Sequence, residues 1–202
     1  QTDIQERHYI GPAAQHQFLV RSHLHRTLGG GWEVSAGMCV FLQNPNDPLA
    51  TDPLTVPELR PHLESVYKQK LGRLTLDHRF RGEARFYHHT NAARTALEEG
   101  YAYSNLRFRY RLQASLRLWE IGENRYLKLK LSDEIHLNAA RQGNVTFFDQ
   151  NRIYAGISTD LSPNLNVDIG YLNWFQQRSS TAYFNRHIVS VLVYHRLGTG
   201  NS

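Results

Sequence analysis

The stretch that most constrains the fold is LTLDHRFRGEARF, residues 74–86, because its side chains divide into two chemically opposite sets if the backbone is extended. Side chains alternate between the two faces of a β-strand. One face then carries leucines, phenylalanines and an alanine, interrupted by His78 and Gly82, while the other carries three arginines and two acids. So many charges do not fit the dry core of a soluble protein. The apolar face is therefore predicted to point outward, as in the wall of a membrane β-barrel with a polar interior.

The same alternation recurs along the chain. The stretch from Tyr103 to Trp119 covers 17 residues, whereas strands of soluble proteins usually have about 5–6. The expected strands are 1–10, 16–26, 32–43, 58–70, 74–86, 103–119, 125–139, 151–160, 165–177 and 184–197. This pattern predicts an all-β chain, a single antiparallel transmembrane β-barrel over residues 1–202, with 10 to 12 strands in an up-and-down meander and an incomplete first strand.

Connections of two lengths alternate between these strands. The shorter ones are expected at 27–31, 71–72, 120–124 and 161–164, and the longer ones at 44–57, 88–102, 140–147 and 178–183. Within 88–102, residues 92–99 could form a helical turn, and Gly11 with Pro12 should form a turn. Outer-membrane barrels have short periplasmic turns and longer external loops. The alternation therefore predicts a periplasmic C-terminus.

Composition excludes some other classes of protein. No run of about 18 apolar residues is present, so a spanning helix is not predicted. The single cysteine, Cys39, cannot form an intrachain disulfide. A net charge of +5 favours an anionic partner, but the basic residues alternate with apolar ones along strands, which argues against nucleic acid. The chain opens at Gln1 without an apolar signal segment, so we expect either a removed signal peptide or a late start.

Several longer stretches carry a family resemblance. They are VPELRPHLESVYKQKLGRLTLDHRFRGEARF, SNLRFRYRLQASL, SDEIHLN and FDQNRIYAGISTDLSPNLNVDIGYLNWFQQR, within about residues 56–197. In these the chain resembles the bacterial outer-membrane β-barrel family catalogued as domain of unknown function 2490. The resemblance implies a multi-pass protein of a Gram-negative outer membrane, frequent in the Bacteroidetes, with a strand and turn before the quoted part. It implies no established activity and no catalytic residues.

The candidate site is a set of charged side chains on the predicted inner face, where basic residues outnumber acids. Its members form a predicted lumen charge network of Arg79, Arg81, Glu83, Arg85, Arg107, Arg109, Arg111, Lys128, Lys130, Glu134 and Arg152. Narrow barrels have interiors that side chains can fill, and Arg–carboxylate pairs suit that purpose. The network is therefore expected to plug the barrel. An anion-selective path or an anionic-ligand site is the alternative.

Enzymatic and metal chemistry receive little support. Nucleophilic catalysis at the lipid face needs a serine beside a histidine, but Ser158 and Ser190 are predicted to face inward and His195 outward. The chain has 11 histidines, yet no cysteine or acidic cluster stands at a recognised metal-ligand spacing. Gly29–Gly31 is predicted to be a turn, because no helix or Lys-Ser/Thr follows it as in a phosphate loop. We expect no catalytic residue, no metal and no cofactor.

Two further features concern the predicted lipid-facing side. Asp133 breaks the apolar alternation of 125–139, and it could mark a β-bulge or a contact with another protein. Aromatic residues towards strand ends are either interfacial girdles or ordinary strand formers. They are Trp32, Trp119, Trp174, Tyr101, Tyr103, Tyr171 and Tyr194.

The function expected is that of a non-enzymatic outer-membrane barrel with a largely occluded, Arg-rich lumen. Such a barrel would serve as a structural or accessory subunit of a larger outer-membrane assembly. Its partners would be outer-membrane lipid, that assembly, and the barrel assembly machinery during insertion. The alternatives are a narrow, porin-like anion-selective pore, an anionic-ligand-binding barrel, and a soluble lipocalin-like barrel.

Overall fold

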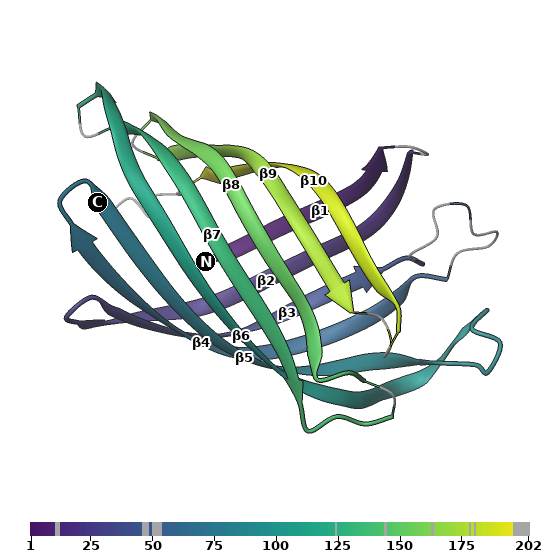
Figure 1. Ribbon diagram of the computed structural model, residues 1–202. Coiled ribbons are helices and arrows are strands. Elements are labelled where there is room, and N and C mark those ends of the chain that lie inside the picture. Colours follow the sequence, from purple (N-terminus) through teal and green to yellow (C-terminus); the bar gives the residue numbers. More distant parts are fainter. Residues whose placement is uncertain are drawn as a thin grey trace, which may run out of the picture. The chain divides into compact units, whose positions relative to one another are not determined.

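The structure, a computed structural model, describes residues 1–10, 13–45, 49, 54–123, 125–143, 145–162, 164–177, 179 and 181–195. It is all-β, and its ten antiparallel strands follow one another in sequence order as a meander (Figure 1). The strands are β1 (Thr2–Ile10), β2 (Ala13–Gly29), β3 (Trp32–Gln43), β4 (Val56–Leu71), β5 (Leu74–Thr90), β6 (Leu97–Gly122), β7 (Arg125–Ala139), β8 (Phe148–Ser162), β9 (Leu165–Gln177) and β10 (Tyr183–His195). Among these residues, no helix has the length and apolar composition needed to cross a membrane.

Each predicted strand overlaps one observed strand, and 32–43, 125–139 and 165–177 agree to the residue. The predicted loop 88–102 is wrong in extent, because β5 continues to Thr90 and β6 already begins at Leu97. The helical turn considered for 92–99 is also wrong. Instead, the Asn91 side chain accepts a hydrogen bond from the Thr95 amide at 2.8 Å, and the Asn91 amide donates to the Ala96 carbonyl at 3.1 Å. These bonds close a short turn.

Some expectations fall on residues that are not described. They are the turn at Gly11 and Pro12, residues 46–48 and 50–53 of the predicted loop 44–57, and the last two positions of the predicted strand 184–197.

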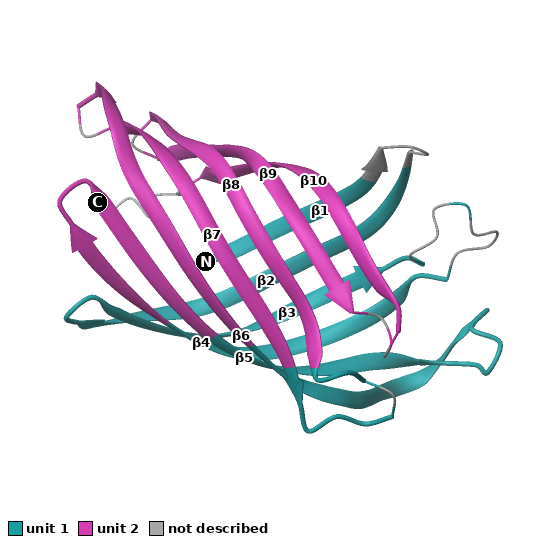
Figure 2. Cartoon of the chain, viewed as in Figure 1, with its two compact units in different colours: residues 1–65, 81–108, 138–147 teal, residues 66–80, 109–137, 148–202 magenta. Residues whose placement is uncertain are grey.

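The chain divides into two compact units (Figure 2). Unit 1 contains residues 1–65, 81–108 and 138–147, and unit 2 contains residues 66–80, 109–137 and 148–202. Unit 1 therefore holds β1–β3, and unit 2 holds β8–β10. Strands β4–β7 contribute residues to both units.

In unit 1, β2 and β3 show the predicted alternation directly. Arg21 lies opposite Cys39, and Val20 lies opposite Val40. Cys39 is buried together with Phe41, whereas Val40 is 43% exposed. The predicted inward and outward positions of residues 32–43 are therefore confirmed.

Unit 2 alternates in the same way. Val189, Val191 and Val193 of β10 are 61–70% exposed, while Glu134 of β7 is buried. The Asp133 backbone pairs with Ile153 without interruption, and the register shift between β7 and β8 comes later, between His136 and Leu137. The bulge considered for Asp133 is therefore wrong. In both units buried charged side chains alternate along the strands with exposed apolar ones.

The glycine in the middle of β3 is needed for close packing. A Cβ atom on Gly37 would lie 2.4 Å from the Ser22 carbonyl oxygen and 2.6 Å from the Cβ atom of His23. Gly37→Ala is therefore expected to lower the free energy of unfolding by about 1–3 kcal/mol, because the neighbouring strand must shift. Urea titration of the folded protein in detergent measures this loss.

Gly82→Ala is the matched control for Gly37→Ala. A Cβ atom on Gly82 would meet only the Phe108 ring, at 3.7 Å, which is an ordinary contact. If both variants lost the same free energy of unfolding, crowding around Gly37 would not be the cause of the loss.

Candidate functional site: the buried arginine network

The buried charged side chains of the two units, here called the arginine network, are the candidate site. In unit 1, Glu58 at the start of β4 is fully buried. Arg60 donates two hydrogen bonds to its carboxylate, both of 2.6 Å, and Arg85 of β5 donates two more, of 2.6 and 3.1 Å. Bidentate Arg–carboxylate pairs are strong and directional. One carboxylate thus accepts hydrogen bonds from two guanidinium groups.

Neighbouring groups support both of these arginines. The Arg60 guanidinium carbon lies 3.8 Å from the centroid of the Phe41 ring, within the range of a cation–π interaction. Arg85 also hydrogen-bonds the Tyr87 hydroxyl. The cluster around Glu58 therefore has an aromatic contact for each cation.

Three further ion pairs lie in unit 1. Arg81 donates from Nε to Glu64 at 2.7 Å, Arg107 donates from Nε to Glu83 at 2.6 Å, and Arg21 donates from Nε to Asp3 at 2.9 Å. The Arg81, Glu83 and Arg107 side chains are buried. Because each pair joins two different strands, the network ties strand to strand through side chains as well as through the backbone.

In unit 2, the buried Glu134 of β7 is the centre of a second cluster. Arg109 of β6 donates from Nε to its carboxylate at 2.9 Å, and Arg79 of β5 forms an ion pair with the same oxygen. His136, which is fully buried, places Nε2 3.4 Å from the other carboxylate oxygen. Glu134 therefore forms ion pairs with two arginines at once, as Glu58 does.

The lysines of β7 pair with acids on the following strands. Lys128 lies 2.7 Å from Asp160 of β8, and Lys130 lies 2.7 Å from Asp168 of β9. Arg111 and Lys68 interact electrostatically with Asp77. These contacts extend the network across unit 2.

A tryptophan between two arginines completes the polar face of unit 2. Trp174 of β9 lies opposite Arg152 of β8 and opposite Arg186 of β10. The two guanidinium carbons lie 4.4 and 4.9 Å from its ring centroid. Trp174 is only 3% exposed, so of the two roles left open for it, that of an ordinary strand residue fits and that of an interfacial girdle does not. The indole lies between two cations that come from the strands on either side of β9.

Comparison with known proteins places the chain in a family. The family model described as "Protein of unknown function (DUF2490)" matches residues 1–185. The chain belongs to this family. The match includes β1–β3, which lie upstream of the stretches that carry the sequence resemblance. A search of curated proteins returns no match to the chain.

The network of this DUF2490 protein contains residues that sequence reasoning left out. Glu58, Asp3 and Asp160 were not counted among the inward acids, and Arg186 was not counted among the inward bases, yet each contacts a member of the polar face. Glu58 could have been found, because it has the same parity as Arg60 and Glu64 on the same strand. Arg196, which the same alternation places inward, lies outside the described residues.

The serine and histidine side chains considered for catalysis differ in their environments. Ser158 of β8 is buried and accepts a 3.1 Å hydrogen bond from the Asn166 side chain, whereas His195 at the end of β10 is exposed. Within the described ranges, no three His, Cys, Asp or Glu side chains are grouped as metal ligands.

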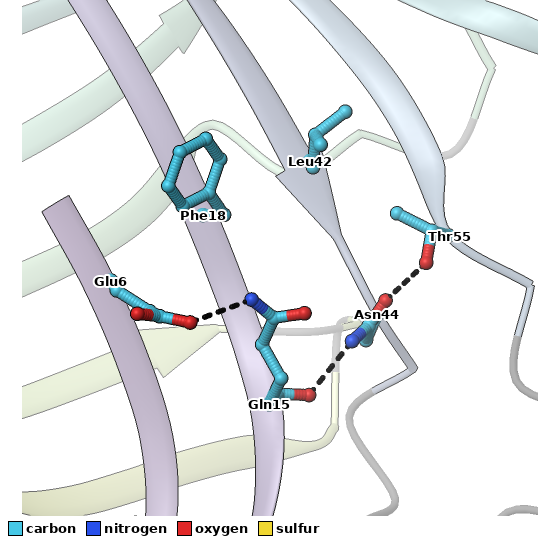
Figure 3. A pocket seen from close by; sticks show the side chains of 6 residues that line it. All are labelled: Glu6, Gln15, Phe18, Leu42, Asn44 and Thr55. Atoms are coloured by element: carbon cyan, nitrogen blue, oxygen red, sulfur yellow. Dashed lines mark hydrogen bonds between the residues drawn. The ribbon is translucent and has the colours of Figure 1, made fainter. Parts of the chain in front are cut away.

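A pocket of about 370 Å³ lies in unit 1 near the ends of β1–β3 (Figure 3). Its polar groups bond mainly to one another. Gln15 donates to Glu6 at 2.8 Å, Asn44 donates to the Gln15 carbonyl at 2.8 Å, and Thr55 donates to Asn44 at 2.5 Å. No member of the arginine network lines it. The pocket therefore adds no chemistry to the site.

Proposed function

We propose that this DUF2490 protein is a closed transmembrane β-barrel of 10 to 12 strands in the outer membrane of a Gram-negative bacterium. Its interior is largely occluded by the arginine network, and it has no enzymatic activity. It serves as a structural or accessory subunit of a larger outer-membrane assembly.

The observation that carries this proposal is the inverted placement of side chains. The exposed apolar residues lie on the strands themselves and include Met38, Val40, Phe80, Phe108, Leu131, Ile153, Ile169 and Val191. A soluble protein rarely exposes so continuous an apolar surface, and a lipocalin-like barrel would place these residues inside. A bilayer covers such a surface, and it favours alternation of apolar outward and polar inward residues.

Exposed aromatic residues near strand ends support a membrane position. Trp32 begins β3 and Trp119 lies near the end of β6, both beside short turns, whereas Tyr183 begins β10 beside a longer connection. Aromatic side chains of this kind favour the two membrane–water interfaces.

The ion pairs support an occluded interior. Glu58 and Glu134 each contact two arginines, Glu64 contacts Arg81, and Glu83 contacts Arg107. Paired groups of this kind fill space and hold strands together, and small barrels have little interior left to fill.

The test is isolation of the tagged full chain from native outer membranes in mild detergent. We expect the folded chain to sediment with the outer membrane and to migrate differently on gels before and after boiling. A partner should elute with it in fixed stoichiometry. Recovery from the soluble periplasmic fraction would contradict the membrane position, and a solitary barrel would contradict the role of subunit.

An anion-selective pore is the second candidate, and the excess of basic over acidic residues in the predicted lumen charge network favours it. Purified barrels in planar bilayers distinguish the two. The occluded subunit is expected to give no steady current, whereas a current carried mainly by anions would favour the pore.

A further inference from the structure

The exposed face of unit 2 carries one polar patch amid its apolar residues. The backbone register defines two adjacent rows across four strands. One row runs Asp133, Ile153, Asn173, His187, and the next runs Ile135, Asn151, Phe175, Asn185. Five of these eight side chains are polar, and we call those five the amide patch: Asp133, Asn151, Asn173, Asn185 and His187.

The members of the amide patch bond to one another in diagonal pairs. Asn151 donates to Asp133 at 2.5 Å, and Asn173 donates to Asn185 at 2.8 Å. His187 hydrogen-bonds the Tyr171 hydroxyl in the next row. A carboxylate has about four acceptor positions, and a primary amide has two donors and an acceptor. Asn151 also donates to the Glu134 backbone carbonyl at 3.4 Å. Together these bonds use only part of the hydrogen-bonding capacity of the five side chains.

Apolar rows lie on one side of the amide patch, and the ends of β8–β10 lie on the other. Towards the short turns, the next row is Leu131, Ala155, Tyr171 and Val189, and the row after it is Leu129, Ile157, Ile169 and Val191. Towards the longer connections, Leu137 lies opposite Phe148, and Tyr183 lies opposite Gln177. The patch therefore lies between the apolar rows and the strand ends.

Lipid chains offer nothing for these groups to bond. Polar side chains that face the membrane usually bind another protein or line a polar path, because unsatisfied groups in hydrocarbon are costly. The network fills the opposite face of these strands, so a protein on the outer face is the partner that the bonding positions of the patch can reach.

We propose that the amide patch is the docking surface for a second, different outer-membrane protein, whose lipid-facing wall places a lysine or arginine opposite Asp133 and hydrogen-bonding side chains opposite the asparagines. This inference rests on the proposed membrane barrel. A second copy of the chain fits less well, because the two rows of the patch contain no lysine or arginine that could meet Asp133.

Photo-cross-linking in native cells tests the docking surface. The full-length chain carries p-benzoyl-phenylalanine at Asn173 or Asn185, and Val191 of the same exposed face is the control position. We expect one discrete adduct from the two patch positions and little from Val191. Peptide mapping should locate the adduct beside an outward-facing lysine or arginine of the partner.

Charge variants at Asp133 sharpen the test. Asp133→Lys should lower the adduct yield about tenfold or more, because like charges then meet across the interface, while Asp133→Glu should retain most of it. Equal yields at Val191, an adduct of two copies of the chain, labelling of lipid alone, or insensitivity to Asp133→Lys would each overturn the proposal.

Membrane recovery keeps the two proposals separate. If each variant is recovered from the outer membrane with its heat-dependent gel shift, a missing adduct refutes only the docking surface. If the parent chain is not recovered there, the membrane proposal fails first.

Discussion

Glu58→Gln is expected to destabilise the folded chain more than any other single change in the network, by about 3–5 kcal/mol, the usual effect of removing one partner from a buried ion pair. The carboxylate is fully buried and accepts four hydrogen bonds from Arg60 and Arg85. A neutral amide would remove the negative charge to which both guanidinium groups bond. Urea unfolding of the protein in detergent, followed by the loss of the unboiled gel band, measures the change.

Glu120→Gln is the control for Glu58→Gln, because Glu120 lies near the end of β6 and its side chain is exposed. Its unfolding midpoint should stay close to that of the parent protein, since exposed charges contribute little to stability. A Glu58→Gln variant as stable as the parent would show that the cluster around Glu58 is not a structural ion pair.

Ile169→Arg is expected to lower the stability of the inserted chain by about 2–4 kcal/mol, the range for a basic residue near the middle of a barrel's lipid face. Ile169 is 56% exposed and lies opposite Val191 within the apolar rows. If water covered this face, an exposed arginine would cost almost nothing. The measurement is urea unfolding in lipid vesicles, together with the fraction of the variant that enters the outer membrane.

Leu97→Arg provides the comparison, because Leu97 is also exposed but begins β6 beside the turn formed at Asn91. This change should have little effect in vesicles. Equal tolerance of arginine at both positions would argue that no bilayer covers β9 and β10.

Alternation along single strands was the part of the fold that sequence could predict. In 74–86 the period of two follows from strand geometry alone, and Arg79, Arg81 and Glu83 are indeed buried while Phe80 is exposed. The same reasoning gave the wrong extent for the loop predicted at 88–102, because polar residues continue there on both faces of the strands. The HHTNAARTALEEG sequence shows no period, so the ends of β5 and β6 could not be located.

The partners within the network depend on register between strands, which sequence does not show. Glu58 and Arg85 are 27 positions apart, and Arg79 and Glu134 are 55 apart. The two roles left open for Trp174 could not be told apart for a related reason. Its position near a strand end fits an interfacial role, but it is buried beside its cross-strand neighbours Arg152 and Arg186.

The meander order of β1–β10 has an evolutionary consequence. Because each strand neighbours the strand before it in sequence, a gene could gain or lose two consecutive strands without rethreading the others. Relatives of different strand number would then differ by whole hairpins. The ion pairs limit where such a change is tolerated. Inserting a hairpin between two strands breaks any ion pair that joins them, such as Glu58–Arg85 or Glu134–Arg109. Insertions should therefore be found between strands that no such pair connects.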